Sequence, residues 1–239
     1  MSILKHIGNP LVYNGRPLDY YVAPGATYPT DSLVARYAFE DNLEDSYGTM
    51  SDLETFSGSA TWTYSTGKVG KSWNSNTTSK NVPTSSLKND TDSAIYNIIN
   101  GTYTIAVWLK LNNAAADLQD VIAFNCSGWK NLRVGGTSDS PPGGAGRLYL
   151  THNSSIYDTV DRRNSTWFHV IYGYNGTNDF MYINNSLIGT AAGVTKTATY
   201  MAISLAWWTM SGEVDQLYFY NKALTSDERS QLYNGGAGI

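Results

Sequence analysis

The fold of this 239-residue chain is decided by two neighbouring runs, WFHVIYGY at residues 167–174 and FMYIN at residues 180–184. Both runs are rich in aromatic and β-branched side chains, which suit the pleated surface of a β-strand. Asn175 and Gly176 stand directly after the first run, and an Asn-Gly pair favours a tight hairpin turn. The two runs are therefore predicted to be adjacent antiparallel strands.

Strand-like runs continue on both sides of this hairpin, at residues 33–39, 60–64, 103–111, 120–125, 147–151, 200–205 and 214–220. Only two short helices are expected, at residues 90–97 and 225–233. In the second, Thr225 and Glu228 have the spacing of a capping box, in which each side chain caps the other's backbone N–H. Many short strands with turn signals between them favour an all-β, two-sheet antiparallel jelly roll.

The composition excludes several classes of protein. Hydrophobic residues make up 41% of the chain, enough for a sizeable core, and charged residues only 15%. The net charge is −4 with no Lys/Arg cluster, so nucleic acid is not an expected partner. No apolar run approaches the roughly 20 residues of a membrane helix, and the N-terminus has no secretory signal pattern. Cys126 has no disulfide partner, and His6, His152 and His169 are too scattered for a zinc motif.

Residues 1–31 differ from the rest, and residues 32–239 are expected to form the jelly-roll domain. Four prolines punctuate the first segment: Pro10, Pro17, Pro24 and Pro29. Proline lacks a donor N–H and disfavours regular structure, so we expect an extended N-terminal arm. The residues expected to anchor this arm to a partner chain are Leu11, Val12, Tyr13, Leu18, Tyr20 and Tyr21. The alternative is that the arm packs along its own domain, for example as an edge strand.

The run GEVDQLYFYNKALTSDE at residues 212–228 resembles the closing pattern of laminin-G-like domains of the concanavalin A-like lectin/glucanase superfamily. Three more stretches resemble that group's central hairpin, the strand before it, and the opening strand with its Asp-Ser-x-Gly turn, at residues 167–189, 104–110 and 35–48. Residues 67–72 match the next motif, although the Phe-Asp-Gly that usually follows is missing. The resemblance spans residues 32–236 and implies two face-to-face antiparallel sheets, carbohydrate or protein binding, and often one structural calcium ion.

Glycosidases of the same superfamily carry two glutamates on one strand, because nucleophile and acid/base must flank one glycosidic bond. Glu213 and Asp215 begin such a motif, but Leu217 and Tyr218 occupy the candidate positions of the second glutamate. The chain is therefore predicted not to be an enzyme. Strand alternation would also place Asp215, Leu217 and Phe219 on one face, which makes Asp215 a structural residue at the edge of the core.

Four acidic residues are candidates for the calcium site that the resemblance implies: Glu40, Asp41, Asp45 and Asp215. Calcium prefers six to eight oxygen ligands from carboxylates, carbonyls and water. Asp45 and Asp215 fall on positions that match the family pattern. The alternative for these residues is ordinary turn chemistry, in which an aspartate caps a bend.

A glycan site needs a flat aromatic surface for the C–H faces of a sugar, with polar groups for its hydroxyls. The candidate ligand-binding residues are Trp207, Trp208, Trp129, Arg133, Tyr149 and His152, with Asn131 as a further polar contact. The alternative is that these tryptophans are core residues or anchor loops.

Two functions follow from these observations. The protein could be a glycan-binding module, or a structural protein whose jelly roll is mainly a building block. Because an arm is present and a secretion signal is not, we expect a virion-surface protein of a phage, such as a head decoration, fibre or tail component. Its arm would bind other virion proteins, its domain would bind host-surface glycans, and a homo-oligomer is compatible with that role. The alternatives are a free-standing extracellular carbohydrate-binding module and, less favoured, a glycoside hydrolase.

Overall fold

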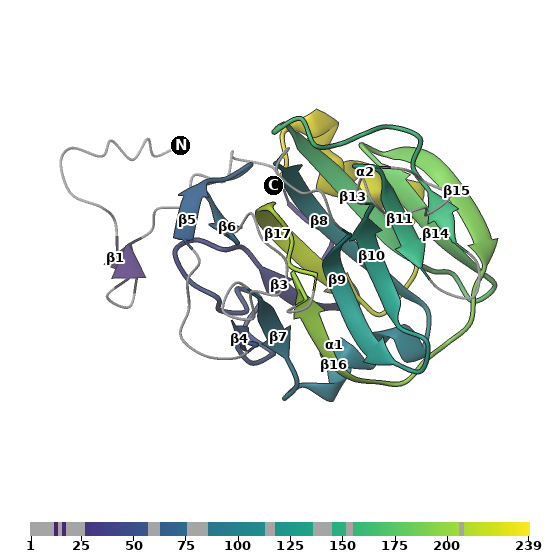
Figure 1. Ribbon diagram of the computed structural model, residues 1–239. Coiled ribbons are helices and arrows are strands. Elements are labelled where there is room, and N and C mark those ends of the chain that lie inside the picture. The colour runs from purple at the N-terminus through teal and green to yellow at the C-terminus, as the bar shows by residue number, and fades with distance from the viewer. Residues whose placement is uncertain are drawn as a thin grey trace.

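The computed structural model describes residues 27–56, 63–75, 86–112, 118–135, 145–151, 155–205 and 208–239, together with two short paired strands, β1 (Val12–Tyr13) and β2 (Arg16–Pro17). Two antiparallel sheets pack face to face, as Figure 1 shows, so the predicted jelly roll is confirmed. No helix in the described part of the chain is long and apolar enough to cross a membrane.

One sheet has seven strands, in the order β12 (Ile156–Tyr157), β11 (Leu148–Thr151), β10 (Lys130–Val134), β9 (Gln119–Cys126), β16 (Ala198–Ile203), β7 (Leu87–Asn89) and β4 (Glu54–Thr55). Its inward-facing side chains form rows, because residues paired across antiparallel strands point to the same face. One such row consists of Leu87, Ile203, Ile122, Leu132, Leu150 and Ile156.

The other sheet has eight strands, in the order β15 (Ser186–Ala192), β14 (Asn178–Ile183), β13 (Trp167–Tyr174), β8 (Tyr103–Leu111), β17 (Gly212–Tyr220), β6 (Lys71–Asn74) and β5 (Thr63–Thr66), with β3 (Leu33–Tyr37) also paired to β17. The predicted hairpin is the pair β13–β14, where Tyr174 is opposite Asp179. Between them the Asn175 side chain accepts hydrogen bonds from the N–H groups of Thr177 (3.1 Å) and Asn178 (2.8 Å).

A β-bulge in β17 changes which residues face the core. The pairing register with β8 shifts between Asp215 and Tyr218, and Gln216 takes a φ of 48°. Val214, Leu217 and Phe219 lie in the core between the sheets, whereas Asp215 is paired with Trp108 on the outer face. The prediction that Asp215, Leu217 and Phe219 share one face is therefore wrong, because the extra residue of the bulge reverses the alternation.

The C-terminal segment covers the outer face of the eight-stranded sheet. It contains α2 (Ser226–Tyr233) and the short turn η3 (Asn234–Gly236). A buried apolar cluster joins Leu224, Leu232 and Ile239 of this segment to Ile171 and Tyr218 of the sheet. The predicted capping box of Thr225 and Glu228 is present at the start of α2. The other predicted helix is found as α1 (Ser93–Tyr96), followed by the turn η2 (Ile98–Asn100).

The described end of the predicted arm packs on its own domain. The Tyr220 hydroxyl donates a hydrogen bond to the carbonyl of Pro29 (2.9 Å), and the rings of Tyr28 and Tyr218 lie 5.5 Å apart. Lys222 forms a salt bridge with Asp31 at 2.5 Å. The proposed anchoring residues Leu11, Leu18, Tyr20 and Tyr21 lie outside the described residues, as do the side chains of Val12 and Tyr13.

Candidate functional site

The outer face of the seven-stranded sheet is built around small side chains. Ala123 of β9 lies opposite Ala202 of β16 on one side and Asn131 of β10 on the other. Ala123 and Ala202 form an apolar cluster with Leu205. Four partly buried aromatic residues pack against this cluster: Phe56, Trp129, Tyr200 and Trp208. Because alanine is short, large rings can lie close to the sheet and keep one side toward solvent.

The aromatic rings of this face support one another edge to face. The ring centroids of Trp129 and Tyr200 are 6.3 Å apart at 73°, and those of Phe56 and Tyr200 are 5.5 Å apart at 69°. Such arrangements are the favourable geometry for aromatic pairs. A tight turn places Trp129, since Gly128 and Trp129 have φ values of 85° and 48° and the Trp129 N–H donates to the Cys126 carbonyl (3.0 Å).

A polar group borders these rings. Nε and Nη2 of Arg133 donate to the two carboxylate oxygens of Asp120, the second at 3.3 Å, and Nδ2 of Asn131 donates to Oδ1 of Asp120 at 3.0 Å. The Arg133 guanidinium also lies 5.4 Å from the centroid of the Trp208 ring. Burial raises the pKa of Asp120, and the charge and hydrogen bonds of Arg133 together with Asn131 oppose that rise.

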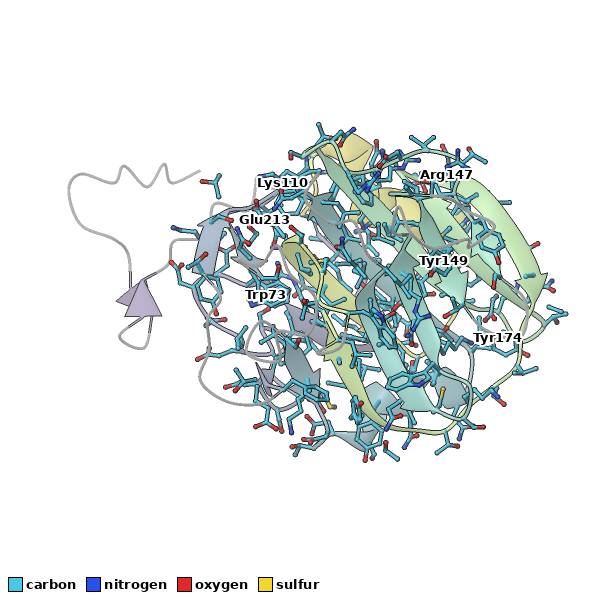
Figure 2. The ribbon with its side chains drawn as sticks, viewed as in Figure 1. Trp73, Lys110, Arg147, Tyr149, Tyr174 and Glu213 are labelled. Carbon is cyan, nitrogen blue, oxygen red and sulfur yellow. The ribbon has the colours of Figure 1, made fainter. Side chains whose placement is uncertain are left out.

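Two tyrosines extend the same face toward the sheet edge. Tyr149 of β11 is paired with Arg133 on one side and with Tyr157 of β12 on the other. The rings of Tyr149 and Tyr157 are stacked, 5.9 Å apart at 24°. Figure 2 labels Tyr149 on β11, next to β10. The face thus runs from Phe56 and Tyr200 across the two tryptophans to these tyrosines, and we call it the aromatic face.

Four of the six predicted ligand-binding residues meet on the aromatic face: Trp129, Trp208, Arg133 and Tyr149. Both tryptophans are partly exposed, so neither is a fully buried core residue. Trp207 and His152 lie outside the described residues. Sequence reasoning did not select Phe56, Tyr200 and Asp120. Tyr200 could have been found, because it stands two residues from Ala202 and shares its face.

Glu213 lies on the other sheet, where its carboxylate is fully engaged. Oε1 accepts a hydrogen bond from Lys110 Nζ (2.8 Å), and Oε2 accepts from the hydroxyls of Ser65 (2.7 Å) and Ser72 (2.9 Å). Figure 2 shows Lys110 and Glu213 beside each other. A buried carboxylate held by three donors ties β8, β17, β5 and β6 together, which is a structural role.

Asp45 likewise organises the backbone around it. Oδ1 accepts hydrogen bonds from the N–H groups of Arg36 (2.9 Å) and Tyr47 (3.0 Å), and Oδ2 from those of Thr49 and Met50 (2.8 Å each). Four N–H donors orient the carboxylate toward the loop it caps, which is the turn chemistry considered above. Asp45 therefore does not fit a calcium ligand, and nearby Asp41 is exposed.

Glu40 and Asp215 fit a cation better. Glu40 Oε2 accepts a hydrogen bond from the Lys71 N–H (3.0 Å), and Asp215 Oδ2 accepts one from the Val69 N–H (2.9 Å). Their second oxygens, Glu40 Oε1 and Asp215 Oδ1, are buried and have no hydrogen-bond partner in the described part of the chain. Burial raises the pKa of both carboxyls, and the charge of Glu40 raises that of Asp215 further.

The described residues contain no group of three His, Cys, Asp or Glu side chains that could hold one metal ion. A calcium ion at Glu40 and Asp215 would therefore need carbonyl and water oxygens for the rest of its ligands.

Comparisons with solved structures identify the fold. Domain 4 of AbnA, a GH43 extracellular arabinanase from Geobacillus stearothermophilus in complex with arabinotriose, aligns with a TM-score of 0.63 and 17% identity, over 87% of this chain and 98% of that domain. The binding domain of Paraclostridial Mosquitocidal Protein 1 aligns with a TM-score of 0.64 and 16% identity, over 86% of this chain and 52% of that one.

The ligand-binding domain of Botulinum neurotoxin serotype D, in complex with N-acetylneuraminic acid, aligns with a TM-score of 0.62 and 12% identity, over 86% of this chain and 51% of that one. This chain thus spans about half the length of the toxin domains that it matches. No curated protein sequence matches it significantly. A family model described as the concanavalin A-like lectin/glucanases superfamily matches residues 76–228, more than half of the chain. The chain is therefore a laminin-G-like member of the concanavalin A-like lectin/glucanases superfamily.

Proposed function

We propose that this protein is a non-catalytic lectin-like domain that binds glycans on the aromatic face. The observation that carries the proposal is that Trp129, Trp208 and Arg133 lie on one sheet surface, where the buried carboxylate of Asp120 orients Arg133. Sugar C–H faces stack on flat rings, and sugar hydroxyls need oriented donors and acceptors beside them. The arabinotriose and N-acetylneuraminic acid complexes of proteins with this fold support the proposal.

Replacing Trp208 by alanine is expected to weaken glycan binding roughly tenfold, because the change removes both a stacking ring and the support of Arg133. The measurement is calorimetric titration with oligosaccharides selected on a glycan array. Trp167→Ala is the matched control, since Trp167 is also partly exposed but lies at the start of β13 in the other sheet. Equal affinities for the Trp208→Ala variant and the wild type would remove this face from the proposal.

A structural calcium ion bound by Glu40 and Asp215 is part of the same proposal, supported by their two carboxylate oxygens that no described residue contacts by a hydrogen bond. A calcium concentration of about 100 times Kd should stabilise the fold by about 3 kcal/mol, which raises the melting temperature by roughly 5–10 °C relative to chelator. The calcium-dependent shift should vanish in Glu40→Gln/Asp215→Asn. It should persist in Asp45→Asn, whose lower stability comes from the capped loop. A melting temperature indifferent to calcium and chelator would refute the site.

The arm supports a second proposal, that the domain is attached to other virion proteins at a virion surface. Its support is the proline-punctuated apolar sequence of the arm and the fixed position of Tyr28, Pro29 and Asp31 on the domain. Deleting residues 1–26 spares these contacts, so the melting temperature should stay unchanged while particle incorporation is lost. Normal incorporation of the truncated protein into particles would contradict the anchoring role.

A further inference from the structure

We infer that Asp120 makes the aromatic face selective for uncharged glycans. Asp120 pairs with Arg133, which is the cation that the carboxylate of an acidic sugar would otherwise bind. This inference rests on the proposed glycan-binding function and refines it. The two sugar complexes among the similar structures differ in this respect, since arabinotriose is neutral and N-acetylneuraminic acid is a carboxylic acid. The selectivity of this chain is decided by the polar group on its own sheet.

Arg133 already uses the side of its guanidinium that binds carboxylates best. Its Nε and Nη2 atoms each contact one oxygen of Asp120. A carboxylate on a ligand would seek the same paired donors, because the guanidinium fork matches two oxygens at once. Trp208 supports the guanidinium as well. Arg133 is therefore held in place as part of a neutral pair and is not a free cation.

If Arg133 paired with a ligand instead, the buried charge of Asp120 would lose its ion-pair partner. Asp120 is fully buried, and Asn131 would remain as its described hydrogen-bond donor. Removing one partner of a buried ion pair is strongly unfavourable because the other charge stays buried and uncompensated. An acidic sugar could therefore reach the Nε and Nη2 donors of Arg133 only by breaking the pair with Asp120. A sugar hydroxyl needs no such exchange, because it can accept a hydrogen bond from an N–H group of Arg133 that Asp120 does not use.

The described strands of this sheet offer no substitute cation. Its seven strands carry three basic residues, and each has a carboxylate partner. Lys88 on β7 pairs with Glu54 (3.3 Å) and Asp90 (2.5 Å). Lys130 on β10 points into the sandwich, where it pairs with Asp179. On the described strands of this sheet an acidic ligand would thus meet paired charges only.

The test compares matched glycans that differ by one acidic residue. Wild-type protein is titrated with lactose and sialyllactose, and with N-acetyllactosamine and its sialylated form, after a glycan array has shown which neutral sugars bind. We expect each neutral member to bind at least about tenfold more tightly than its acidic counterpart. Asp120→Asn keeps the side-chain shape and removes the charge, so it should raise the affinity for the acidic members about tenfold. Asp120→Asn/Arg133→Gln should lose that gain.

The outcomes separate the two proposals. Tighter binding of acidic than of neutral members by the wild type would overturn the selectivity inference and leave glycan binding in place. A folded Asp120→Asn variant that prefers neutral over acidic members as strongly as the wild type would also overturn the selectivity inference. Absence of binding to every glycan on the array would overturn the proposed function and, with it, this inference. The wild-type comparison decides the matter even if Asp120→Asn fails to fold.

Discussion

Replacing Asp179 by alanine is expected to lower the free energy of unfolding by about 3–5 kcal/mol. Asp179 on β14 and Lys130 on β10 are both fully buried, and their salt bridge of 2.9 Å crosses the core from one sheet to the other. Lys130 also lies over the rings of Tyr103 (4.9 Å) and Tyr174 (5.4 Å). Without Asp179 the ammonium group would stay buried beside these rings with no carboxylate.

The double variant Lys130→Met/Asp179→Leu separates the charge from the packing. Apolar side chains of similar length remove both buried charges, so most of the stability lost in Asp179→Ala should return. Denaturant unfolding of the three proteins measures both effects. If Asp179→Ala lowers the free energy of unfolding by less than about 1 kcal/mol, the ion pair at this position is not fully buried.

Acidification from pH 7 to pH 4 is expected to remove about 3 kcal/mol of stability through His169 alone. Complete burial lowers the pKa of His169 from 6.5 to about 3. Its ring is stacked with Trp108 (4.9 Å) and Tyr233 (6.1 Å), and neither nitrogen has a hydrogen-bond partner among the described residues. His169 of the unfolded chain binds a proton below pH 6.5, whereas His169 of the folded chain stays neutral down to about pH 3. The neutral ring therefore stabilises the fold above pH 6.5, and this stability is lost as the pH falls.

The variant His169→Phe is the control for this effect. Phenylalanine can stack on Trp108 and Tyr233 and leaves no unpartnered nitrogen, so we expect it to be at least as stable as the wild type at pH 7. The difference in unfolding free energy between the two proteins should widen by about 3 kcal/mol between pH 7 and pH 4. Other groups, such as Asp215 and Glu40, titrate in both proteins and cancel in the comparison. A constant difference over this range would show that His169 is protonated or exposed in the fold.

The sequence predicted the fold where the signals are local. The hairpin at Asn175 and the capping box of Thr225 depend on residues close together in the chain, and both are present. The bulge at Gln216 was missed because glutamine carries no signal for a positive φ. Missing it reversed the face assigned to Asp215. The four N–H donors of Asp45 could not be foreseen either, since they depend on the path of the whole loop.

The candidate site could be predicted in part. Trp129, Trp208 and Arg133 were selected because their chemistry suits sugars, which is a property of each residue by itself. Asp120 and Phe56 were missed because their importance arises from strand pairing. Asp120 pairs with Arg133 only because β9 brings the two residues opposite each other. A bulge between Leu132 and Arg133 shifts that register. Cross-strand register is fixed by the packed sheets and cannot be read from neighbours in the chain.

The central claim is that glycans bind on the outer face of the seven-stranded sheet. The most direct test is to follow the backbone amide resonances of the isotope-labelled protein by NMR during titration with the best-bound oligosaccharide of the array. We predict that the shifts concentrate in β9, β10, β11 and β16, around Ala123, Asn131 and Tyr149. Shifts confined to the eight-stranded sheet, or to α2 and the segment after it, would contradict the claim.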